Sequence, residues 1–157
     1  MNAAAETSPR ALPARAGFVF WSLVVCFAVT LAYWVVWFFV DRDLLASAHT
    51  TAYYAFENAF PAADSWMALC ALAGAVALHR RWASSLLFCL LAGSASLYLA
   101  GMDILFDLQN GIYLAPTGDW GGVVVEAVIN LATLLVGAYV VRWAWRNRRA
   151  LAALDGW

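Results

Sequence analysis

The chain has 157 residues, of which 65% are hydrophobic and 12% are charged, and its formal net charge is −1. A soluble domain carries about 25% charged residues, so the composition excludes an ordinary soluble domain and indicates a membrane protein. The absence of a basic excess also excludes the usual electrostatic footprint of a nucleic-acid-binding protein. We therefore expect the lipid bilayer, and no nucleic acid, as a partner of this chain.

Four apolar runs are long enough to cross a bilayer. A helix rises about 1.5 Å per residue, so a hydrocarbon core of ~30 Å needs about 20 residues. The expected transmembrane helices cover about 17–40, 61–79, 82–108 and 121–146. They predict one all-α membrane domain over 17–149, a polytopic antiparallel bundle of four helices. Residues 1–16 are expected to form a mobile cytoplasmic tail, and residues 150–157 a second cytoplasmic tail.

The segment between the first two spans is semi-polar and rich in aromatic residues. His49, Tyr53, Phe56 and Phe60 would share one stripe of a helix. This pattern predicts a short interfacial helix that leads into the second span. Pro61 suits the first turn of that span, because proline is tolerated where no backbone N–H partner is needed.

The arginines indicate how the spans are oriented. The chain has no lysine, and with four crossings all its arginines except Arg42 fall on one side. These are Arg10, Arg15, Arg80, Arg81, Arg142, Arg146, Arg148 and Arg149. The positive-inside rule then predicts that both termini are cytoplasmic.

Two carboxyl groups lie near the end of the third span. Asp103 and Asp107 are four residues apart, so on a helix they share one face. The same face carries Ala92, Ser96 and Ala100, and membrane helices approach each other closely at such small residues. Asp103 is therefore expected to point toward other helices, with a role at the end of the helix as the alternative. For Asp107 we favour a solvated interfacial carboxylate, with a place in a binding site as the alternative.

The second and fourth spans carry acids on comparable faces. Glu126 and Asn130 would lie about 7 Å and 13 Å below the start of the fourth span. A carboxylate in the hydrocarbon costs about 2.5–3.5 kcal/mol, so Glu126 is expected to have a partner or a role. Asn130 is more typical of helix packing. Asp64 lies on a face with Ala68, or it simply suits an N-terminal helical turn.

The acids predict an inward acidic pocket that opens to the outer side. Its candidate ligand-binding residues are Glu126, Asp103, Asp64, Asn130, Asp107, Tyr33, Trp37, Glu57 and His49. Tyr33 and Trp37 are equally typical of interfacial aromatic residues. His49 and Glu57 also have an ordinary interpretation, as residues of a polar connection.

Several membrane chemistries do not fit the sequence. Di-iron and zinc sites in bundles use Glu-x-x-His motifs, and none occurs. The chain has three cysteines, without the paired cysteines of quinone-linked disulfide oxidoreductases. The first span lacks the glutamate of small multidrug resistance transporters. Sterol-isomerase-like proteins of the emopamil-binding type offer only an analogy. We expect no cofactor, and whether the acids bind a metal stays open.

Two stretches carry a wider resemblance. They are Phe56-Glu57-Asn58-Ala59-Phe60-Pro61 and Asp103-Ile104-Leu105-Phe106-Asp107-Leu108-Gln109-Asn110-Gly111-Ile112-Tyr113. With these, the chain from Phe18 to Arg149 resembles a type of small bacterial four-helix inner-membrane protein. The resemblance implies the fold and a location in the bacterial inner membrane, and it implies no activity. The Ala- and Arg-rich composition suits a GC-rich bacterial genome.

Two functions of different class follow as hypotheses. In the first, the acidic pocket binds or moves a cation, a proton or a small polar ligand. In the second, the acids fix helix packing, and the chain is a structural or accessory subunit with a homo-oligomeric or other membrane partner. A lipid-modifying enzyme with Asp103 or Glu126 as acid–base group is a third, less favoured alternative, because no nucleophile or phosphate-binding loop accompanies these acids.

Overall fold

The computed structural model describes residues 11–114 and 120–154, and within these ranges the chain is helical without any strand. The long helices are α1 (Ala16–Phe39), α3 (Pro61–Arg80), α4 (Ser85–Gln109) and α5 (Trp120–Arg146). Shorter helices are η1 (Arg42–Leu44), α2 (Thr51–Glu57) and α6 (Arg148–Ala152). Four helical stretches, one of them α2 and α3 taken together, are long and apolar enough to cross a membrane. This confirms the predicted all-helical class and the predicted number of helical stretches that are long and apolar enough to span a membrane.

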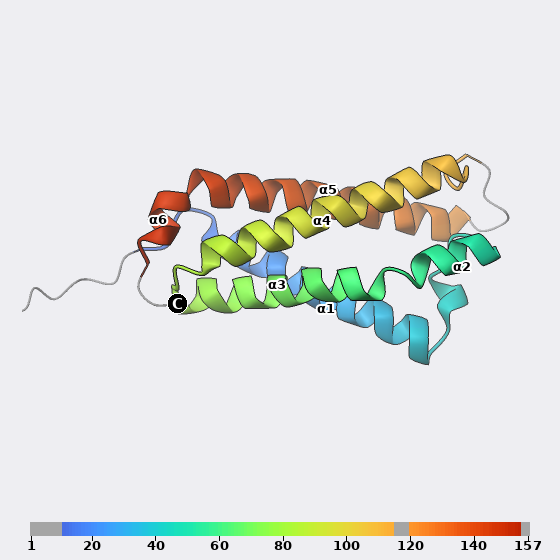
Figure 1. Cartoon of the computed structure of the whole chain (residues 1–157), viewed down its shortest axis with the longest axis horizontal. Helices are drawn as coiled ribbons and strands as arrows, with labels where there is room; N and C mark the ends of the chain where they lie inside the picture. Colours follow the sequence, from blue (N-terminus) through green and yellow to red (C-terminus); the bar gives the residue numbers. More distant parts are fainter. Residues whose placement is uncertain (1–10, 115–119, 155–157) are drawn as a thin grey trace, which may run out of the picture.

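The long helices lie side by side along the long axis of the molecule, and α2 and α6 lie at opposite ends of it (Figure 1). Helix α4 packs against both α3 and α5, and α1 packs against α3. Helix α1 also reaches α5 through side chains, since the rings of Phe18 and Tyr139 meet edge to face at 5.2 Å.

Small residues form the helix interfaces, as the sequence pattern predicts. Ala68, Ala71 and Ala75 are buried on α3, and Ala92, Ser96 and Ala100 are buried on α4. Helices α4 and α5 come close together at two glycines. A Cβ atom built on Gly137 would lie 3.0 Å from the carbonyl oxygen of Gly93, so only glycine allows the two backbones to come this close.

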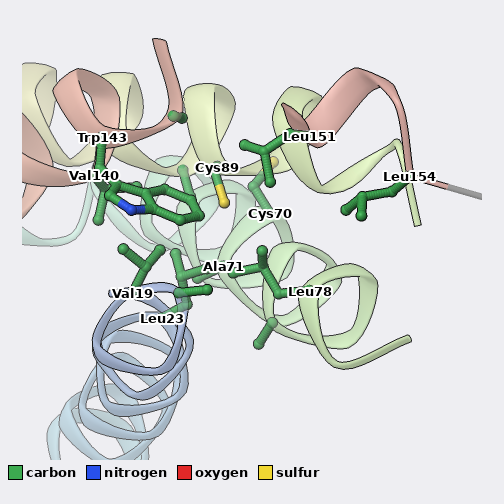
Figure 2. Packing of buried hydrophobic residues seen from close by; sticks show 14 residues of the cluster. Val19, Leu23, Cys70, Ala71, Leu78, Cys89, Val140, Trp143, Leu151 and Leu154 are labelled. Carbon is green, nitrogen blue, oxygen red and sulfur yellow. The ribbon is translucent and has the colours of Figure 1, made fainter. Parts of the chain in front are cut away.

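One apolar core lies at the α6 end of the molecule (Figure 2). It joins Val19 and Leu23 of α1, Leu78 of α3, Cys89 of α4 and Trp143 of α5. The beginnings of α1 and α4 therefore meet the ends of α3 and α5 in this core. The buried positions of Cys70 and Cys89 agree with cysteines that act as small hydrophobic residues.

Described residues before α1 and after α5 also take part in this core. Leu151 of α6 and Leu154 are buried in it. On the other side, Trp143 Nε1 donates a hydrogen bond to the carbonyl oxygen of Ala14 at 2.9 Å. Of the tail expected over 1–16, residues 11–16 lie against this core, and residues 1–10 lie outside the described residues. Tertiary packing of Leu12 and Leu151 overrides their polar surroundings in the sequence.

A second core lies at the α2 end. It contains Trp34 and Trp37 of α1, Tyr53 of α2, Ile112 and Val123. Helix α2 begins after Thr50, whose Oγ1 accepts a hydrogen bond from the backbone N–H of Tyr53 at 3.1 Å, as an N-cap residue does. This cap fixes the direction in which α2 presents Tyr53 and Glu57 to the long helices.

Candidate functional site

Five carboxyl groups gather at the α2 end of the molecule. They belong to Glu57 at the end of α2, Asp64 in the first turn of α3, Asp103 and Asp107 on α4, and Glu126 on α5. Asp103 interacts electrostatically with the other four. We call these five residues the acid cluster.

The acid cluster has no basic partner among the described residues. The only ion pairs in that part of the chain join Asp43 to Arg42 and to His49, and they lie on the exposed surface. Four of the five carboxyl groups, those of Glu57, Asp64, Asp107 and Glu126, receive hydrogen bonds from neutral donors. A site rich in carboxyl groups and free of basic side chains attracts cations or protons.

Helix α1 supplies two of these neutral donors, and a third residue of the same face donates to the neighbouring Asn58. Tyr33 Oη donates to Glu57 Oε2 at 2.9 Å, and Trp34 Nε1 donates to Asp64 Oδ2 at 3.0 Å. Trp37 Nε1 donates at 3.0 Å to Asn58 Oδ1, just after Glu57. The bonds tie α1 to α2 and α3, and the stacking of Tyr33 on Trp37 keeps the two donors aligned.

The Tyr33–Glu57 bond can be tested with a matched pair of tyrosines. We expect Tyr33→Phe to lower the free energy of unfolding by about 0.6 kcal/mol and by no more than ~1.7 kcal/mol, the range for hydrogen bonds between membrane helices. Tyr98→Phe is the control, because Tyr98 is on α4 and 65% exposed. Unfolding titrations in mixed micelles measure both. Equal losses in the two variants would show that the bond contributes nothing.

Asp107 is the most buried of the acids, being only 1% exposed. Its Oδ2 accepts a hydrogen bond from Asn130 Nδ2 at 3.3 Å, and the same amide donates to Tyr113 Oη at 3.2 Å. Its Oδ1 has no hydrogen-bond partner in the described part of the chain. The preferred interpretation of Asp107 as a solvated interfacial carboxylate is therefore wrong, because the turn at 110–114 folds over it and places Ile112 in the adjacent core.

Tyr113, which comes from that turn, stays protonated at neutral pH. Burial raises the pKa of its hydroxyl above the ordinary value, and its hydrogen bond with the Asp107 carboxylate raises the pKa further. The hydroxyl can therefore donate to Asp107 while it accepts from Asn130.

Glu126 is reached by α2 and by the loop before it. Tyr53 Oη donates to Glu126 Oε2 at 3.4 Å and accepts from the backbone N–H of Ser47 at 3.3 Å. The Glu126 carboxyl also interacts with that of Asp107 across the α4–α5 interface. Glu126 thus lies between the loop at Ser47 and the buried carboxyl of Asp107.

The structure brings most of the sequence-predicted residues together. Those at or beside the acid cluster are Glu57, Asp64, Asp103, Asp107, Glu126, Asn130 and Tyr33. Trp37 donates a hydrogen bond to Asn58, the residue that follows Glu57. His49 is separate: it is exposed, and its Nδ1 lies 2.9 Å from Tyr54 Oη. Because Thr50 caps α2, His49 precedes the helix and does not share its stripe.

Four contributors went unrecognised in the sequence. Trp34, Ser47, Tyr53 and Tyr113 all contact the acid cluster or its donors. Tyr53 could have been found, since the sequence already predicts a helix there with Tyr53 and Phe56 on one face, and α2 contains both residues. Ser47 and Tyr113 come from turns, and no periodic pattern places a turn residue.

The geometry limits the chemistry of the cluster. Within the described ranges, no three or more His, Cys, Asp or Glu side chains come together in a way that could hold a metal ion. The site instead offers pairs of carboxyl groups with phenol, indole and amide donors. In searches of known proteins, no family, curated protein or solved structure matches this chain.

Proposed function

We propose that the chain is a multi-pass protein of the bacterial inner membrane, an antiparallel bundle with both termini on the cytoplasmic side. The distribution of charge supports this. Arg80 and Arg81 at the end of α3 and Arg142 and Arg146 at the end of α5 lie toward the α6 core, whereas the acid cluster lies toward α2. Basic residues favour the cytoplasmic side of a membrane.

We further propose that the acid cluster is an outward-facing acidic pocket that binds or moves a cation, a proton or a small polar ligand. The observation that carries this proposal is the convergence of five carboxyl groups from α2, α3, α4 and α5 with no basic partner in the described residues. A bound positive charge would relieve their mutual repulsion, which scales inversely with distance and grows where water is excluded.

A purely apolar interface would be a less costly way to pack these helices. Each intramembrane carboxylate costs about 2.5–3.5 kcal/mol on insertion scales, and Asp107 is buried with one oxygen unpartnered. Residues that destabilise the fold in this way are typical of binding sites, where function requires a less stable arrangement.

A thermal-shift screen tests the proposal. The purified full chain in detergent would be exposed to inorganic cations, pH steps and small amines. Because a ligand that binds only the folded state raises the midpoint by mass action, we expect at least one condition to stabilise the wild type. Glu126→Gln and Asp103→Asn should abolish the shift. Asp43→Asn, an exposed acid at the same end, should retain it.

A structural or accessory role is the second candidate. It is favoured by the neutral donors, since Tyr33, Trp34, Tyr53 and Asn130 each join an acid to a different helical segment. In this case no ligand would shift the midpoint, Glu126→Gln would only destabilise the bundle, and a second membrane protein would co-purify with the chain.

A further inference from the structure

We infer that the side chains of Ser47, Asp107 and Glu126 form an oxygen-lined site for a small monovalent inorganic cation. The inference rests on the proposed function and deepens it, because it assigns the binding position within the acid cluster and the class of ligand. It depends on two buried oxygen atoms that lack a hydrogen-bond partner, each in a residue that neighbours Glu126.

The first unsatisfied atom is the hydroxyl oxygen of Ser47. Ser47 is only 6% exposed, and its side chain lies beside the Glu126 carboxyl and the Tyr53 hydroxyl. Even so, Ser47 Oγ has no hydrogen-bond partner of normal length and angle among the described residues. Buried hydroxyl groups are almost always hydrogen-bonded, so this oxygen requires a partner.

The second unsatisfied atom is Asp107 Oδ1. The Asp107 carboxyl interacts with the side chains of Glu126 and Tyr113, and its Oδ2 is held by Asn130 at 3.3 Å, whereas Oδ1 has no hydrogen-bond partner of normal length and angle among the described residues. An unpartnered buried polar atom costs about 1–3 kcal/mol, and more when it is charged. Both unsatisfied oxygens therefore border the same carboxyl group, although they come from a loop and from α4, which are 60 residues apart in sequence.

The donor set determines the class of ligand. Ser47, Asp107, Glu126 and the nearby Tyr53 offer only oxygen atoms, which suit hard cations. Calcium takes about six to eight oxygen ligands, and magnesium keeps several of its waters. A site with two carboxyl groups and two hydroxyl groups supplies too few oxygens for calcium, and its burial among aromatic residues excludes the waters that magnesium keeps. A monovalent ion with a weakly held hydration shell fits it better.

The experiment measures the thermal midpoint of the full chain in nanodiscs at fixed ionic strength, with choline chloride replaced stepwise by lithium, sodium or potassium chloride. We expect one of these ions to raise the midpoint of the wild type. Ser47→Ala and Asp107→Asn should each weaken the apparent affinity by about tenfold or more, which corresponds to the loss of one ligand. Ser94→Ala and Asp43→Asn are the matched controls, because both side chains lie outside the acid cluster, and they should leave the response unchanged.

Three results would overturn the inference. If the ion response persists in both Ser47→Ala and Asp107→Asn, the ion binds elsewhere in the acid cluster, and the proposed function stands. If the wild type responds only to pH, calcium, magnesium or an amine, the ligand class is wrong, and the proposed function again stands. If no condition shifts the wild type, both proposals fail, and a bridging water is the simplest partner for the two oxygens.

Discussion

Replacing Gly137 with alanine is expected to lower the free energy of unfolding by about 1–3 kcal/mol, the usual cost of overpacking a tight interface. The added Cβ would lie 2.9 Å from Ser96 Cβ and 3.0 Å from the carbonyl oxygen of Gly93. The second contact is with backbone, so no side-chain rotation can relieve it. Helices α4 and α5 would have to separate along their whole line of contact.

The control for this substitution is Gly101→Ala on α4, where an added Cβ meets no atom within 4 Å. Alanine is a better helix former than glycine by about 1 kcal/mol, so Gly101→Ala should leave the stability unchanged or raise it. The two variants share the same chemical change and differ only in what the methyl group meets. Equal midpoints in a denaturant titration would contradict the close approach of α4 and α5.

The separation of α4 and α5 should also affect the acid cluster. Asp107 and Asn130 face each other across this interface, and their side chains are 3.3 Å apart. A shift of less than 1 Å would therefore break the bond that holds Asp107. Ligand response, if present in the wild type, should weaken more in Gly137→Ala than in variants of the α6 core that lose the same stability.

The sequence predicts the spans well, because hydrocarbon leaves the backbone few options. Every N–H and C=O group in a bilayer core must be satisfied internally, so a long uncharged run such as 17–40 becomes a helix. The sequence also predicts which face of each helix is buried. Ala71, Ala92 and Gly137 are buried as their spacing predicts, because the period of 3.6 residues fixes which residues can share a face.

The parts that the sequence does not predict come from turns and chain ends. Asp107 looks interfacial by position, yet the turn that carries Tyr113 covers it. Leu151 follows four arginines and looks like part of a solvated tail, yet it is buried in the α6 core. In both cases a short segment folds back on the bundle, and the contact depends on tertiary geometry that periodicity does not encode.

The acid cluster depends both on helix faces, which the sequence predicts, and on tertiary contacts, which it does not. The shared face of Asp103 and Asp107 and the depth of Glu126 are visible in the sequence. The donors that hold the cluster are visible only in the fold, since Tyr53 reaches Glu126 across 73 positions and Trp34 reaches Asp64 across 30. The charged groups of the site are therefore visible in the sequence, whereas the hydrogen-bond donors that position them are visible only in the structure.

The second large effect is expected from Asn130→Ala. This change removes the donor to Asp107 Oδ2 and leaves a buried carboxyl group without its amide partner, so the free energy of unfolding should fall by about 1–3 kcal/mol. Asn110→Ala is the control, since Asn110 is exposed and bonds only its own helix, and it should cost about 0.5 kcal/mol or less.

A double-mutant cycle shows whether the loss comes from Asp107. If the unpartnered carboxylate is the cause, Asp107→Asn should cost less in the Asn130→Ala background than in the wild type, with a coupling of about 0.5–3 kcal/mol for groups in direct contact. Additive losses would mean that Asn130 acts through Tyr113 instead, to which its amide donates at 3.2 Å. The Tyr113→Phe background then distinguishes the Asn130–Asp107 bond from the Asn130–Tyr113 bond, because it removes the hydroxyl group and leaves the carboxyl group in place. A coupling that survives in Tyr113→Phe assigns the stabilisation to the Asn130–Asp107 bond, which then accounts for how the buried Asp107 carboxyl group stays ordered at the end of α4.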